Sequence, residues 1–376
     1  MNPLQKKRPF YERVPAVCKA IYVLTAVCAV LYFVFTKNAA FSDWFNQWIS
    51  RWGRRLLAAL TGWLPFSVAE LLLLSSPIIL IVLIGRVILI YSRNRKRTLS
   101  FLARLLAAVC VIAILFVLCF APGYYGTSLD RKLGLERTRV SADDLYQTAL
   151  LLTAEINPLA EQLLMDGDGA SVMPYPLSEM NRKLIDAYQT FTEDRSFPDH
   201  FSSRVKPVAM SEAMSYTHIT GVYTFFTGEA NLNVAFPDYS IPFTAAHELA
   251  HQRGVAREDE ANFVAFLVCL SSDDAYLRYS GLMSVFEYVS NALYSADKTL
   301  YRAAYATLGE NARSEEYAYA VFFEKYRENV AATVSEATNN AYLQSQGAKE
   351  GTRSYNMVVD LAVAYYRPLF PGADGD

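Results

Sequence analysis

This sequence of 376 residues contains few cysteines and few histidines, and its net charge is small. The five cysteines include no Cys-x-x-Cys pair, so neither a disulfide-stapled scaffold nor a cysteine metal site is expected. The formal net charge is −2, which gives no electrostatic basis for binding nucleic acid. Because the chain has only four histidines, two of them within one short motif carry more information than they would in a histidine-rich protein.

Apolar residues, by contrast, are abundant: they make up 53% of the chain and are concentrated in its first third. Apolar runs at about residues 17–35, 66–91 and 105–121 each approach the roughly 20 residues that a helix needs to cross a lipid bilayer. We therefore predict a membrane domain over residues 1–121 with three transmembrane helices. Between the first two runs Trp44, Trp48 and Trp52 recur every four residues, which predicts a helix at about residues 41–58 that lies in the membrane interface or packs on the spans.

Basic residues predict how the membrane domain is oriented. They are densest before the first run and between the second and third, at Lys6, Lys7, Arg8, Arg13, Arg93, Arg95, Lys96 and Arg97. The positive-inside rule places both segments, including the N-terminus, in the cytoplasm. With three spans, residues 122–376 then form an extracytoplasmic domain of a multi-pass protein of the cytoplasmic membrane. The link between the first two runs opposes this orientation with Arg51, Arg54 and Arg55, but it is less densely basic.

The remainder of the chain is expected to be mainly helical. Apolar periodicity predicts helices at about residues 141–164, 177–192, 243–253, 257–270, 276–294, 298–308, 314–342 and 355–366. Two stretches rich in β-branched and aromatic residues, at about residues 216–226 and 230–236, predict a β-hairpin. An edge strand beside a peptidase site can bind extended substrate through its backbone, so Gly228, Glu229, Ala230 and Asn231 are predicted to bind substrate. A hairpin that only covers the core is the alternative.

The motif His247-Glu248-Leu249-Ala250-His251 carries the main chemical signal. A four-residue spacing on a helix places both imidazoles on one face, one turn apart, where they can share a metal ion. Glu248 can then take a proton from water at that metal, as in the His-Glu-x-x-His arrangement of zinc peptidases. We predict Zn²⁺ as the cofactor, with Glu248 as the catalytic base. A helix that carries these residues by accident is the competing interpretation.

Catalytic zinc usually takes three protein ligands and leaves one position for water. The extended motif with a third histidine fails, because Arg257 stands at that position. A glutamate at the start of the next helix is the remaining solution, and Glu258 is preferred because Asn262 lies one turn later on the same face and could support a ligand. Glu260 is the alternative ligand. Acidic residues in a first helical turn also stabilise a helix dipole without any metal.

The stretch Glu258-Asp259-Glu260-Ala261-Asn262 resembles the Glu-x-x-Ala-Asp/Asn signature of membrane metallopeptidases related to the CAAX-prenyl and heat-shock membrane proteases. It also resembles the Glu-x-Glu-Ala-Asn of ImmA/IrrE-type peptidases. Residues 215–294, with three spans ahead of them, resemble the bacterial membrane-protein family named domain of unknown function 3810. The metallopeptidase likeness implies a zincin-like domain of the gluzincin kind. The chain departs from the CAAX-type pattern in the short gap after His251 and in having Asn at position 262.

These inferences together predict a membrane-anchored zinc metallopeptidase, a hydrolase that cleaves an unidentified peptide or protein substrate on the outer face of the cytoplasmic membrane. Tyr216, His218 and Tyr223 are candidate donors to the developing oxyanion by their proximity in sequence. The alternative is a non-catalytic envelope protein with a structural or vestigial zinc site. A structural site would have a fourth protein ligand, whereas a catalytic site would open onto a cleft.

Overall fold

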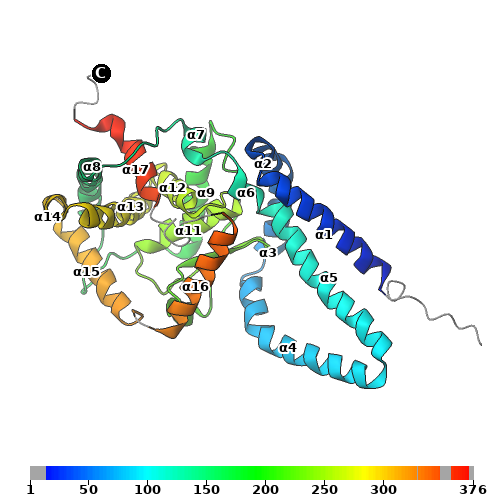
Figure 1. Ribbon diagram of the computed structural model, residues 1–376. Helices are drawn as coiled ribbons and strands as arrows, with labels where there is room; N and C mark the ends of the chain where they lie inside the picture. Colours follow the sequence, from blue (N-terminus) through cyan, green and yellow to red (C-terminus); the bar gives the residue numbers. More distant parts are fainter. Residues whose placement is uncertain (1–13, 328, 348–356, 372–376) are drawn as a thin grey trace, which may run out of the picture.

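The computed structural model describes residues 14–327, 329–347 and 357–371. The protein is mainly helical, as predicted, with three long apolar helices near the N-terminus and one small sheet. Figure 1 shows the long helices (the membrane unit, residues 14–121) beside a rounded bundle of shorter helices (the globular unit, residues 122–371).

The three predicted spans are confirmed as helices long and apolar enough to cross a membrane: α1 (Ala16–Phe35), α4 (Val68–Arg93) and α5 (Arg95–Cys119). In Figure 1, α1 lies along α5, whereas α4 meets α5 only near their shared turn. No residue of α4 is buried by protein. A helix with so much exposed apolar surface is stable where the solvent is lipid.

The predicted interfacial helix consists of three consecutive pieces: α2 (Ala39–Phe45), the π-helix η2 (Asn46–Ser50) and α3 (Arg51–Gly62). Trp44, Trp48 and Trp52 are 50%, 54% and 62% exposed, which suits an aromatic face in the membrane interface. The opposite face is polar and buried, and Asn46 and Arg54 pack against protein. The segment therefore packs on protein through its polar face, and its exposed tryptophans remain consistent with the predicted place in the membrane interface.

The core of the globular unit is built on α11 (Ser240–Gln252), α12 (Glu258–Leu270) and α13 (Ala275–Ala296), whose apolar residues are almost all buried. Around them pack α8 (Ala142–Ala160), α9 (Leu177–Thr192) and α17 (Val358–Tyr366). The remaining helices are α6 (Pro122–Tyr125), α7 (Leu129–Leu133), α10 (Ser211–Ser215), α14 (Lys298–Ala306), α15 (Glu310–Glu324), α16 (Val330–Ser345) and the 3₁₀-helix η4 (Arg367–Leu369).

The single helix predicted over residues 314–342 is wrong: α15 and α16 are separate. The break has a local cause, because the Asn329 side chain accepts the N–H of Ala332 at 2.8 Å and so begins a new helix. The last predicted helix, 355–366, corresponds to α17, and its first two residues lie outside the described ranges.

The predicted hairpin is confirmed with shorter strands, β2 (Gly221–Thr224) and β3 (Glu229–Leu232), which pair antiparallel. A third strand, β1 (Val205–Pro207), pairs parallel with the other side of β3. The order β1-β3-β2 makes β3 the central strand and β2 an edge. The hairpin turn packs directly on α3, since a Cβ added at Gly228 would lie 2.6 Å from the Cβ of Leu57.

Candidate metal centre and its cavity

The loop between α11 and α12 brings the predicted motifs together. Every residue from Ile241 to Gln252 is buried, so α11 is fixed on all sides. Gly254 ends this helix with a φ of +96°, a backbone conformation that favours glycine. The chain then reverses, and α12 begins at Glu258 with its first turn beside the last two turns of α11.

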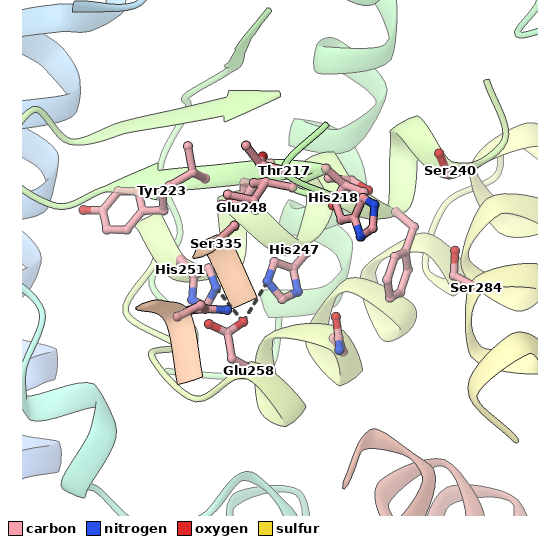
Figure 2. Close-up of a pocket in the computed structure, with 18 of the residues that line it drawn as sticks. Thr217, His218, Tyr223, Ser240, His247, Glu248, His251, Glu258, Ser284 and Ser335 are labelled. Atoms are coloured by element: carbon pink, nitrogen blue, oxygen red, sulfur yellow. Dashed lines mark ion pairs between the residues drawn. The ribbon is translucent and has the colours of Figure 1, made fainter. Parts of the chain in front are cut away.

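Figure 2 shows the side chains of His247, His251 and Glu258 pointing toward one another. The Nε2 atoms of His247 and His251 lie 3.2 and 3.3 Å from Oε2 of Glu258. The ligand atoms of the three residues all lie within 4.8 Å of one another, and the two imidazole centroids are 4.6 Å apart. The geometry therefore gives three potential ligands around one point.

The chemistry of this donor set fits a divalent metal ion. His251 donates its Nδ1 hydrogen to the carbonyl of Val255 at 2.7 Å, so its Nε2 faces Glu258 and carries either a second proton or a lone pair that can bind a metal ion. A lone pair facing a carboxylate oxygen is unfavourable unless a cation is shared between them. Oε2 of Glu258 and Nδ1 of His247 are moreover buried without a hydrogen-bond partner. A zinc ion bound by the two Nε2 atoms and the carboxylate would satisfy Oε2 of Glu258, although it would leave Nδ1 of His247 without a partner.

Electrostatics also favour a cation at this point. Burial alone would lower the pKa of His251, but the Glu258 carboxylate opposes it and raises the pKa to about 9. Burial would likewise raise the pKa of Glu258, yet the two imidazoles bring it well below its usual range. The three groups therefore favour a shared positive charge, which either a proton or a metal ion can supply.

Glu248 lies on the other side of the imidazoles, against the edge strand β2. Its burial raises its pKa to about 6, although the two imidazoles act in the opposite direction. The backbone N–H of Tyr223 donates to this carboxylate, while Oε2 is buried without a partner. The close approach requires Gly221, since a Cβ there would lie 2.6 Å from Oε1 of Glu248. A carboxylate with a free oxygen and a pKa near neutrality suits a general base.

These groups line a cavity of about 870 Å³. Toward the membrane unit its wall is aromatic (Phe120, Tyr124, Tyr223 and Phe225), and the ring of Phe120 lies 6.0 Å from that of His251. We call this the aromatic arm. On the other side of the triad, toward Ser240 and Ser284 in Figure 2, is a polar region that we call the acidic arm: Tyr239, Ser240, Ser284, Glu287 and Tyr319. Helix α16 also lines the cavity, with Ala332, Ser335, Glu336, Thr338, Asn339 and Tyr342.

The structure brings the predicted ligands and base into this cavity, and it also places Asn262 in the lining, where Nδ2 donates to the hydroxyl of Tyr288 at 3.4 Å. The alternative ligand Glu260 lies elsewhere. It accepts the N–H of Leu129 at 2.7 Å and pairs with Arg257, so its carboxylate is already engaged away from the histidines.

The four residues predicted to bind substrate are not in the cavity lining. Gly228 lies in the hairpin turn, and Glu229, Ala230 and Asn231 lie in the central strand β3 with at most 2% exposure. Glu229 is occupied by Lys206 and by the N-terminus of α4. The strand that borders the cavity is β2, because β1 covers the other side of β3.

None of the three residues suggested as oxyanion donors is aimed at the triad. Tyr216 is outside the cavity lining and packs on Tyr326. His218 donates Nε2–H to the carbonyl of Tyr326 at 2.6 Å. The hydroxyl of Tyr223 points away from the histidines in Figure 2. Sequence reasoning missed Tyr288, whose hydroxyl accepts from Asn262 and can therefore donate its own hydrogen elsewhere.

The membrane unit holds the end of the motif helix. Arg54, only 1% exposed, donates to Oδ1 of Asn46 at 2.7 Å and to the carbonyl of Cys119 at 3.0 Å. Asn46 in turn donates to the carbonyl of Gly254 at 2.9 Å. One buried guanidinium thus lies at the C-terminal ends of both α5 and α11, where positive charge is favourable.

Residues 41–363 match the family described as "Protein of unknown function (DUF3810)". The chain belongs to this family. The matched range begins in α2 and ends in α17, and it contains every residue that lines the cavity. No curated protein and no solved structure matches the chain.

Proposed function

We propose that this protein is a membrane-anchored zinc metallopeptidase. The observation that carries the proposal is the meeting of His247, His251 and Glu258 around one point, next to the partnerless Oε2 of Glu248, in a cavity large enough for several residues of an extended peptide. Each of these groups is buried or nearly so, and such polar groups need a ligand if they are not to weaken the fold.

In this proposal the two imidazoles and Glu258 bind Zn²⁺, which, when bound, supplies a Lewis acid that activates water and polarises a carbonyl. Glu248 accepts the proton of the attacking water at Oε2 and delivers it to the leaving amine. Gly221 and the N–H of Tyr223 hold that carboxylate in place. Strand β2 offers an edge for extended substrate, and the hydroxyl of Tyr288 is the proposed donor to the carbonyl oxygen.

We further propose that the globular unit lies on the outer face of the cytoplasmic membrane. The densest basic segments flank α1 and join α4 to α5. The three arginines that oppose this orientation are held in contacts within the protein. Arg51 and Arg55 pair with Asp199 of the globular unit at 3.3 and 2.8 Å, and Arg54 is buried. Residues fixed in protein contacts are weaker signals of the cytoplasmic side than free ones.

A structural or vestigial zinc site is the rival function. Structural zinc is typically enclosed by four protein ligands. Among the described residues, the cluster that could hold a metal has three, and it lines a cavity. This arrangement favours catalysis, and the experiment below separates the two functions.

The test compares variants of the full-length protein purified in detergent. We expect one zinc per chain by metal analysis in the wild type and in Glu248→Gln, and loss of zinc in His251→Ala but not in the control His200→Ala. Glu248→Gln should reduce cleavage of a quenched-fluorescent peptide library by about three orders of magnitude or more, whereas the exposed control Glu324→Gln should not. Zinc binding without any cleavage would instead support the structural site.

A further inference from the structure

Away from the histidines, the cavity has an acid without a cationic partner among the described residues. Its lining includes four glutamates, Glu248, Glu258, Glu287 and Glu336, and no lysine or arginine among the described residues. A bound zinc ion would offset only the charge around the triad. Glu287, in the acidic arm, belongs to a different helix and takes no part in the proposed metal site.

Glu287 extends from α13 one turn after Ser284 and is mostly buried. The hydroxyl of Tyr239 donates to its Oε1. The charged groups around it are the carboxylates of Glu315 and Glu316 on α15, which reinforce the effect of burial and raise the pKa of Glu287 to about 7. The local field therefore disfavours a negative charge here unless a positive group enters.

Two other buried carboxylates of this protein have cationic partners. Glu229 pairs with Lys206 at 2.7 Å, and Glu260 pairs with Arg257. Glu315 forms no ion pair with any residue that the structure describes, but it is fully buried outside the cavity lining and accepts a backbone N–H from Ser171. Glu287 differs from the first two because no cation among the described residues pairs with it, and it differs from Glu315 because it lines the cavity.

The same cavity holds the partnerless oxygen of Glu248, which is 4% exposed, and the partnerless Nδ1 of His247, which is 8% exposed. Buried polar atoms without partners are typical of sites that take a ligand, and these two atoms belong to the histidine motif rather than to the acidic arm with Glu287. A ligand that contacts both regions would put its reacting bond at the triad and another group in the acidic arm.

We propose that Glu287, supported by Tyr239, forms a subsite for a positively charged nitrogen of the peptide substrate. Either a lysine or arginine side chain or a free amino terminus supplies this chemistry. The inference deepens the proposed peptidase function and rests on it. Glu336 of α16 adds negative charge on the same cavity, while the aromatic arm accepts apolar side chains on the membrane side.

The test measures binding rather than turnover, using full-length zinc-loaded protein in detergent. The probes are phosphinic pseudodipeptides, which bind zinc and resist cleavage, with arginine, lysine or uncharged norleucine on either side of the phosphinate. Each is made with a free and with an acetylated amino terminus. We expect one cationic probe to bind at least about tenfold tighter than its norleucine counterpart.

Glu287→Gln should reduce this preference to about threefold or less while keeping zinc content and norleucine-probe affinity, and the control Glu324→Gln should leave the preference unchanged. If the advantage of arginine or lysine survives acetylation, the side chain is the cation. If only the probes with a free amino terminus bind tightly, that amino terminus is the cation. Equal binding of charged and neutral probes by the wild type would overturn the subsite, even if Glu287→Gln does not fold. If no phosphinate binds the zinc-loaded protein, the proposed peptidase function itself is overturned.

Discussion

Glu229 and Glu248 are both buried glutamates near the small sheet, but their surroundings are opposite. Glu229, 2% exposed, accepts hydrogen bonds from Lys206 and from the backbone N–H groups of Val68 and Ala69 at the start of α4. Glu248, 4% exposed, has one oxygen without a partner and a pKa that burial raises to about 6. The first carboxylate is satisfied by the fold, and the second is kept available.

This difference shows how charges that stabilise the fold can be separated from charges that are available to a ligand. Where the globular unit meets the membrane unit, acids and bases occur in pairs: Glu229 with Lys206, and Asp199 with Arg55. In the cavity the acids have no lysine or arginine among the described lining residues, and of the four only Glu258 pairs with the histidines. Removing a paired carboxylate should lower the stability of the fold. Removing an unpaired carboxylate of the cavity should instead lower activity or ligand binding and leave stability unchanged.

The largest effect on stability is expected for Glu229→Gln. It leaves the Lys206 ammonium buried without its carboxylate and takes negative charge from the N-terminus of α4, at a cost of about 3–5 kcal/mol in the free energy of unfolding. Denaturant unfolding of the full-length protein in detergent measures it. Glu248→Gln is the matched comparison and should unfold at the same or a higher denaturant concentration at pH 8. If both substitutions are equally mild, the distinction between paired and available acids fails.

A pH-dependent effect is expected for Glu315, a fully buried acid that lacks an ion pair but is satisfied by hydrogen bonds. Burial raises its pKa to about 7, from an ordinary value near 4.5. Between these values the unfolded chain loses this proton while the folded one keeps it, so stability falls as pH rises from 4.5 to 7. Glu315→Gln should therefore stabilise the protein at pH 8 by about 3 kcal/mol and by almost nothing at pH 4.5. Thermal unfolding at both pH values checks this, and a gain that does not change with pH would contradict it.

The sequence predicted the parts that depend on local spacing. The lengths of the apolar runs predicted the three spans. The spacing of His247, Glu248 and His251 predicted that they lie close together on one helix, and all three line one cavity. Glu258 could be proposed as a metal ligand because only the five residues 253–257 lie between the end of α11 and the start of α12. So short a link keeps the start of α12 close to the end of α11.

The parts that depend on distant segments could not be predicted. β1 has three residues, one of them a proline, and carries no strand signal, yet its pairing makes β3 central and leaves β2 as the edge. This is why substrate binding was predicted at Gly228 to Asn231 rather than beside Gly221. Phe120, the residue after α5, and Glu287 of α13 likewise reach the cavity from segments whose sequences indicated only a span and a buried helix.

Gly221→Ala tests whether Glu248 can act as a base only when strand β2 holds its carboxylate in the observed position. The added Cβ would lie 2.6 Å from Oε1, so the carboxylate must shift. A displacement of about 1 Å in a reacting group can cost on the order of 100-fold in rate, so kcat/KM should fall by about that factor while zinc content is retained. Gly167→Ala is the control, because nothing lies within 4 Å of a Cβ there. Unchanged peptide cleavage in Gly221→Ala would show that the strand does not position the base.

The smallest effect is expected for Asp199→Asn at the junction of the two units. Its carboxylate accepts two hydrogen bonds from Arg55, at 2.8 and 3.0 Å, and the side chains of Arg51 and Arg55 are about a quarter exposed. Solvent screens such pairs, so the loss should be about 1 kcal/mol or less and should shrink as salt is raised from 0.05 to about 0.5 M. Denaturant unfolding at the two salt concentrations measures it, with the exposed pair variant Glu324→Gln as the reference for a solvated ion pair. A salt-independent loss as large as that of Glu229→Gln would mean that this junction, too, depends on fully desolvated charge, and that the two units fold as one.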